Sequence, residues 1–161
     1  FSRMHDVIEK HDGPILNYIG DSIMIVFGAP NEVDDHELKA VECAVEMRKV
    51  LDELNDEWDK VEFSRYWKNH GINKVEARAG IHSGSVIAGN IGSDRMLQYS
   101  AIGDVVNVAA RLEQSNKEFG TDICFSHEIY INLKKDLHDN ASLSGEIKLK
   151  GRSSPLKVYS I

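Results

Sequence analysis

Two short apolar runs separated by a two-residue turn constrain the fold of this chain more than any other feature. Residues 15–19 and 22–27 are rich in β-branched and aromatic side chains, and Gly20-Asp21 joins them. Glycine adopts positive φ without steric cost, so Gly-Asp between two such runs is typical of a tight β-hairpin. The sequence therefore predicts an antiparallel strand pair here, with the Asp21 carboxylate at its tip.

Helical and strand patterns alternate along the rest of the chain. Apolar spacing predicts helices over residues 1–11, 38–58, 104–118 and 126–133, with Asp34 and Asp35 as candidate N-caps of the second. Strands are expected at residues 75–82, 85–91, 99–102, 122–125, 146–150 and 156–161, the first two forming a hairpin through Ser83-Gly84. Residues 59–74 are expected to be a loop or a helix extension. This order favours an α+β or α/β class with a mostly antiparallel sheet.

Composition limits what kind of protein this is. The 161 residues match one domain, spanning 1–161, and 42% hydrophobic content is enough to form a core. The net charge of −7 argues against nucleic acid as a partner, because general nucleic-acid binders need a basic face. No apolar run approaches the roughly 18 residues of a spanning helix. The two cysteines, Cys43 and Cys124, lie outside any zinc-binding pattern and are expected to be reduced thiols of a cytoplasmic protein.

Two features could carry chemistry. Asp21 is either a turn-favoured residue or a metal ligand, because hard cations prefer oxygen ligands on rigid elements. In the helix predicted over 104–118, Asn107 and Arg111 are four residues apart and share a face that points away from the apolar side. That face is either simply solvated or an anion site, since the arginine fork suits phosphate oxygens. A phosphate site and a metal ligand together suggest a nucleotide.

Three ordered motifs resemble the bacterial-type class III adenylate/guanylate cyclase catalytic domain. They are NYIGDSIMIVFGAP at residues 17–30, GIHSGSV with GNIG at residues 80–92, and YSAIGDVVNVAARLE at residues 99–113. The resemblance implies an α+β, ferredoxin-like fold of the polymerase-palm type. It also implies a head-to-tail homodimer in signal transduction, with the active site at the interface. There the ribose 3′-oxygen of ATP attacks the α-phosphate, assisted by two Mg²⁺ or Mn²⁺ ions, and pyrophosphate leaves.

The resemblance assigns roles to individual residues. Asp21 matches a metal-binding aspartate, Asn107 the residue that orients the ribose, and Arg111 the arginine that stabilises charge on the α-phosphate. Asn107 and Arg111 would come from one subunit and Asp21 from its partner. Lys150 is the candidate contact for the terminal phosphates, with Lys148 as the second choice.

Two positions of the resemblance concern the nucleobase. Asn17 replaces the lysine or glutamate of most members, and Ser100 stands where adenylate cyclases often have aspartate or threonine. The Asn17 amide can both donate and accept hydrogen bonds, so it could face either purine. The Ser100 hydroxyl is closer to the threonine of bacterial adenylate cyclases, so the pair favours ATP, with GTP as the alternative. Ser85 stands where some relatives have a phosphate-binding arginine.

The chain also departs from the family pattern at its start. It begins at Phe1 without the family's first strand, which carries the second metal-binding aspartate. We therefore expect a fold that lacks this strand, little or no turnover by these residues alone, and a larger parent protein with an upstream regulatory domain. Another copy or segment could fill the open sheet position. A degenerate cyclase-like module that binds nucleotide or only dimerises is the alternative. A diguanylate cyclase is not favoured, because its signature is absent at residues 19–23.

Overall fold

The predicted hairpin is present in the computed structural model, which describes residues 1–149, 151 and 154–161. Strand β1 (Ile15–Ile19) pairs antiparallel with β2 (Ser22–Ile25), and Gly20 has a φ of 62° in the turn between them. Only glycine adopts this left-handed conformation at little cost, which explains why the turn falls at this residue. The elements that flank the hairpin are α1 (Ser2–Lys10) and α2 (His36–Lys60).

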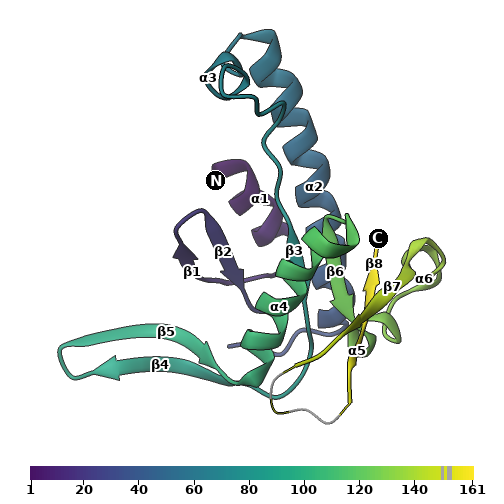
Figure 1. Cartoon of the computed structure of the whole chain (residues 1–161). Helices are drawn as coiled ribbons and strands as arrows, with labels where there is room; N and C mark the ends of the chain where they lie inside the picture. The colour runs from purple at the N-terminus through teal and green to yellow at the C-terminus, as the bar shows by residue number, and fades with distance from the viewer. Residues whose placement is uncertain (150, 152–153) are drawn as a thin grey trace.

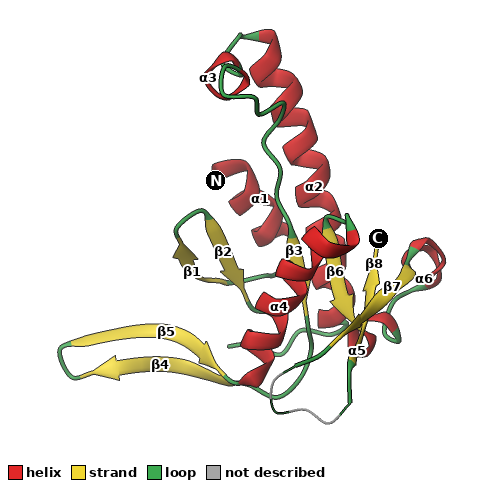
Figure 2. Cartoon of the chain, in the orientation of Figure 1, coloured by secondary structure: helices red, strands yellow, loops and turns green. Residues whose placement is uncertain are grey.

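The remaining elements follow in the order shown in Figures 1 and 2. They are α3 (Arg65–Lys68), β3 (Ala79–Ile81), β4 (Ile87–Ser93), β5 (Met96–Ile102), α4 (Asp104–Phe119), β6 (Ile123–Ser126), α5 (His127–Tyr130), α6 (Lys135–Asn140), β7 (Ser142–Ile147) and β8 (Leu156–Ser160). The expected α+β class is confirmed. No helix in the described part of the chain combines the length and the apolarity needed to cross a bilayer.

Strand pairing differs from the sequence prediction in one respect. The expected hairpin between residues 75–82 and 85–91 is wrong, because β3 pairs in parallel with β6 and β4 pairs with β5. Ser93 pairs with Met96, so the turn of the actual hairpin lies at residues 94–95. Strand periodicity reports which face of a strand is buried but not which strand lies beside it, and this is why the pairing was missed. Figure 1 shows the β4–β5 hairpin projecting from the body of the molecule.

The main sheet has the order β3-β6-β8-β7 and is covered by helices on both faces. On one face, Leu38 and Val41 of α2 pack with Ile123 and Phe125 of β6. On the other face, residues of α4 pack with Cys124 of β6 and with β8. Alternate residues of one strand point to opposite faces, so β6 is buried on both sides and lies at the centre of the core.

The β1–β2 hairpin forms a separate sheet. Within the described residues, β2 makes no ladder with β3. Helix α1 packs beside the hairpin and against α2, with Val7, Ile8 and Cys43 buried between them. Ion pairs from Arg3 and Lys10 to glutamates of α2 extend this contact on the surface.

Helix α2 is longer than the sequence predicted and ends in an aromatic cluster. Asp35 occupies its N-cap position, but the Asp35 side chain makes no capping hydrogen bond. At the other end, the α2 residue Trp58 contacts Phe63 and Trp67, with ring centroids 6.4 and 5.5 Å apart. Residues 59–74 therefore form the end of α2, the short helix α3 and the turns around it, held by their own aromatic contacts.

Candidate functional site

Helix α4 carries Asn107 and Arg111, the two residues predicted to contact the ribose and the α-phosphate. Val108 and Leu112 are buried against the sheet, whereas Asn107 and Arg111 are exposed on the other side of the helix. Arg111 donates from Nη1 to the Gln114 Oε1 atom at 3.3 Å. An exposed hydrogen bond of this kind contributes little free energy, so it can be replaced by a hydrogen bond to a ligand at little cost. The guanidinium is therefore free to bind an anion. The predicted shared face of Asn107 and Arg111 is confirmed.

The backbone of β3 lies directly under α4. A Cβ atom added at Gly80 would lie 2.2 Å from both the Ala109 O and Glu113 N atoms, and one at Gly84 would lie 2.9 Å from a Val105 methyl group. The helix therefore rests on backbone rather than on side chains, which leaves it little freedom to shift. Sequence reasoning missed this contact, although the Gly-x-x-x-Gly spacing of residues 80–84 is a signal for close packing.

Asp21 lies where the hairpin prediction puts it, in the exposed turn between β1 and β2. In residues 1–149, 151 and 154–161, no group of three or more histidine, cysteine, aspartate or glutamate side chains could hold a metal ion. Divalent cations such as Mg²⁺ need several oxygen ligands, and Asp21 supplies a single carboxylate. The described residues of one chain therefore do not fit a complete cation site.

The two residues predicted to contact the nucleobase come from strands that lie close together. Asn17 of β1 lies opposite Met24 of β2, beside a bulge in β1. Ser100 of β5 lies opposite Gly89 of β4. Both side chains are half-buried, and β1 and β5 contact each other although they belong to different sheets.

The sequence predicts terminal-phosphate contacts at two lysines near the end of the chain, and Ser85 stands where some relatives have a phosphate-binding arginine. Lys150, the first choice for the terminal phosphates, lies outside the described residues. Lys148, the second choice, is exposed just after β7. Ser85 lies in the segment between β3 and β4.

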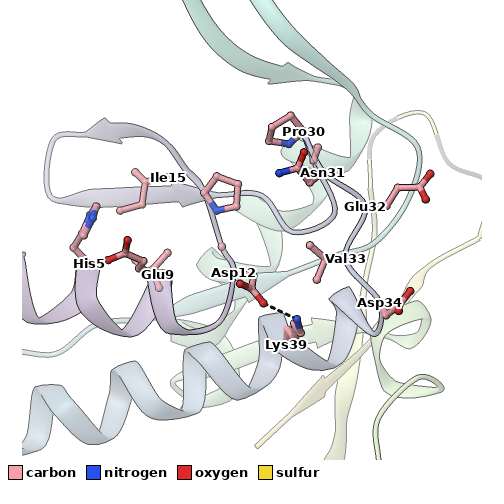
Figure 3. Close-up of a pocket in the computed structure, with 14 residues that line it drawn as sticks. His5, Glu9, Asp12, Ile15, Pro30, Asn31, Glu32, Val33, Asp34 and Lys39 are labelled. Atoms are coloured by element: carbon pink, nitrogen blue, oxygen red, sulfur yellow. Dashed lines mark hydrogen bonds and ion pairs between the residues drawn. The ribbon is translucent and has the colours of Figure 1, made fainter.

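A separate pocket of about 710 Å³ lies between α1, the 29–34 loop and the start of α2 (Figure 3). Four of its lining residues are acidic, and Lys39 donates to the Asp12 Oδ2 atom at 2.7 Å. This hydrogen bond holds the pKa of Asp12 below its usual value. None of the predicted site residues that the structure describes lines this pocket.

Comparison with known families agrees with this arrangement of motifs and elements. The family model described as "Adenylate and Guanylate cyclase catalytic domain" matches residues 1–161. The chain belongs to this family, so the fold and the motifs on it define a nucleotide cyclase catalytic domain.

The curated relatives include proteins named adenylate cyclases. The chain is 34% identical to adenylate cyclase 1 of Rhizobium meliloti, over all of this chain and 23% of that protein. It is 30% identical to the adenylate cyclase of Anabaena cylindrica, over 98% of this chain and 30% of that protein. The chain thus spans less than a third of these curated relatives.

Solved structures give the same result for the fold. The guanylyl cyclase Cya2 superposes with a TM-score of 0.77 at 31% identity, covering 99% of this chain and 75% of that one. The adenylyl cyclase CyaB from P. aeruginosa superposes with a TM-score of 0.75 at 30% identity, covering 99% and 76%. The chain is therefore similar to cyclases of both kinds.

Proposed function

We propose that this chain is the catalytic domain of an adenylate cyclase, which converts ATP to cyclic AMP and pyrophosphate. The observation that carries the proposal is the exposed face of α4, where Asn107 and Arg111 lie one turn apart on a helix supported by the backbone of β3. Curated relatives at 34% and 30% identity are named adenylate cyclases, which favours ATP. Guanylate cyclase is the alternative, because Cya2 is a guanylyl cyclase at 31% identity.

The reaction is an intramolecular displacement at the α-phosphorus. The ribose 3′-oxygen forms a new bond to phosphorus, the bond to the β-phosphate oxygen breaks, and pyrophosphate leaves with the electron pair. The 3′-hydroxyl proton passes to solvent. Negative charge grows on the α-phosphate oxygens in the transition state, and the Arg111 guanidinium donates hydrogen bonds to these oxygens. Asn107 holds the ribose so that its 3′-oxygen faces the phosphorus.

Base selection rests on Asn17 and Ser100. The Asn17 amide can donate to adenine N1 or accept from the adenine amino group, and the Ser100 hydroxyl has the same freedom. Neither side chain carries a charge, so discrimination against guanine depends on hydrogen-bond geometry alone.

The family generally uses divalent metal ions, and two Mg²⁺ or Mn²⁺ ions would neutralise phosphate charge when bound. Asp21 would provide one carboxylate ligand. Because one chain does not make a complete cation site in the described residues, we derive no step of the reaction from the metal. Lys150, or Lys148 in its place, would contact the terminal phosphates.

We further propose that two copies of the domain form a head-to-tail homodimer. Ile87, Met96 and Leu97 on the projecting β4–β5 hairpin are 74%, 75% and 63% exposed, which is unusual for large apolar side chains of a monomer. A second copy would cover them, and its Asp21 would face Asn107 and Arg111. A regulatory domain upstream in a longer protein would control this dimer in signal transduction, because the curated relatives are several times longer than the chain. A catalytically inactive module that binds nucleotide or only dimerises is the alternative.

Product identity tests the proposal. The full-length protein is incubated with Mn²⁺ and equal concentrations of ATP and GTP, and the cyclic nucleotides are separated and quantified by mass spectrometry. An excess of cyclic AMP is the expected result. An excess of cyclic GMP would contradict the assignment of ATP as substrate but would agree with the proposed mechanism. A folded dimer that makes neither product would favour the inactive module.

A further inference from the structure

We infer that Asn116 is a positioning residue that holds α4 in the register required by Asn107 and Arg111. This inference rests on the proposed function, because it concerns how the site residues on α4 are held. Asn116 lies near the carboxyl end of α4 and is 1% exposed.

The Asn116 side chain connects α4 to two other segments. Its Nδ2 atom donates to the Ala79 O atom of β3 at 2.9 Å. Its Oδ1 atom accepts from the Thr121 hydroxyl at 2.8 Å, in the turn before β6. The same Nδ2 atom also lies 3.0 Å from the Glu113 O and 3.3 Å from the Leu112 O atoms within the helix. One buried amide therefore links α4, β3 and the start of β6.

The hydrogen-bond partners leave a single orientation for this amide. Three of its neighbours are carbonyl oxygens, which can only accept, so the NH₂ group must face them. The carbonyl oxygen of the amide then faces the Thr121 hydroxyl, which can donate. This buried amide has partners on both its NH₂ group and its oxygen, so it has little freedom to rotate, because rotation would separate paired polar groups in the core.

Asn116 lies on the other side of α4 from the site residues. At about 100° per residue it points roughly 140° away from Arg111 and roughly 180° away from Asn107. It therefore acts through the helix rather than on the nucleotide. The close contact of Gly80 with the helix backbone limits how near α4 can lie to β3, and the Asn116 bond to Ala79 opposes sliding and rotation along the strand.

A second asparagine provides a matched control. Asn55 of α2 donates to the Val75 O atom at 2.9 Å and accepts from the Val75 N atom at 2.9 Å. It also ties a helix to the backbone of another segment, but α2 carries none of the proposed site residues. Asn55→Ala therefore removes the same kind of bond without affecting α4.

The experiment compares Asn116→Ala, Asn55→Ala and Arg111→Ala, and the double variant of Asn116 and Arg111, in the full-length protein. Cyclic nucleotide formation is measured per folded molecule, with kcat and KM determined separately. We expect Asn116→Ala to lower kcat by about 10-fold with KM within about 2-fold, because a small misplacement of catalytic groups is costly. Asn55→Ala should lower the melting temperature and leave kcat unchanged. In the Arg111→Ala background, Asn116→Ala should lower kcat by less than about 3-fold, because residues that act together are not additive.

The other possible outcomes contradict either the inference or the proposed function. Wild-type kcat per folded molecule in Asn116→Ala, or the same loss with and without Arg111, would overturn the inference. If Asn116→Ala does not fold, Thr121→Val removes only the hydroxyl that orients the amide, and an unchanged kcat there would also overturn it. If the wild-type protein makes no cyclic nucleotide, the proposed function fails. Hydrogen–deuterium exchange then tests the placement of α4. The amides of α4 should exchange at least about 10-fold faster in Asn116→Ala than in wild type, whereas those of α2 should not. Equal exchange rates of α4 in the two proteins would refute the inference.

Discussion

Replacement of Gly80 by alanine tests whether the contact between α4 and β3 determines the position of the site. The added Cβ atom would lie 2.2 Å from the Ala109 O and Glu113 N atoms. These two backbone groups are hydrogen-bonded to each other in the helix, and Arg111 lies in the turn that they close. The alanine methyl would therefore press on the turn that carries Arg111.

The size of the effect follows from these distances. An ordinary contact begins at 3.4 Å, so moving from 2.2 to 3.4 Å displaces one element by about 1.2 Å. Overpacking of this kind costs about 1–3 kcal/mol, which lowers the melting temperature of a domain of this size by roughly 2–12 °C. A displacement near 1 Å at a catalytic group can cost about 10²-fold in kcat.

The assay measures the melting temperature and kcat of Gly80→Ala in the full-length protein. Gly89→Ala in β4 is the control for stability, because a Cβ atom at that position has no neighbour within 4 Å. We expect Gly80→Ala to be folded, less stable and about 100-fold slower, while Gly89→Ala keeps or slightly raises the melting temperature. A Gly80→Ala protein with the wild-type melting temperature and kcat would refute the reasoning.

Four further predictions concern single side chains. Arg111→Ala should lower kcat by about 10²–10³-fold with little change in nucleotide affinity, and equal losses in both would contradict a transition-state role. Asn17→Lys should raise the ratio of catalytic efficiency with ATP to that with GTP, and an unchanged ratio would mean that Asn17 does not contact the base. Burial raises the pKa of the Cys43 thiol to about 12, so an alkylating agent should label it only in denaturant, and fast labelling of the native protein would contradict this. Hydrogen bonds from Lys10 and His11 lower the pKa of Glu46 in the folded state, so this stabilisation is present above the ordinary value of 4.5 and is lost as pH falls below it. Glu46→Gln should therefore show a smaller fall in melting temperature between about pH 5 and pH 3 than wild type, and parallel curves would contradict this.

The sequence predicted most of the helices and strands because local patterns determine them. The hairpin at Gly20-Asp21 needs only a turn residue that tolerates positive φ between two apolar runs, and it is present. The shared face of Asn107 and Arg111 follows from helical geometry alone, and it is also present. The predicted pairing of residues 75–82 with 85–91 was wrong because the partner strand is distant in the sequence. Strand β3 pairs with β6, some forty residues further along the chain. Nothing local to residues 79–81 distinguishes that partner from the next strand.

The sequence by itself therefore determined the family, the main elements and the identity of the candidate site residues, because these depend on short motifs and on periodicity. Tertiary structure decided how those residues are supported. Gly80 is informative only once α4 lies across it, and Asn116 is a polar helix residue of no obvious interest until its amide is found buried between α4, β3 and the turn before β6. Both depend on the contact between α4 and β3, which are more than 20 residues apart in the sequence. A one-dimensional pattern carries no information on which segments will touch.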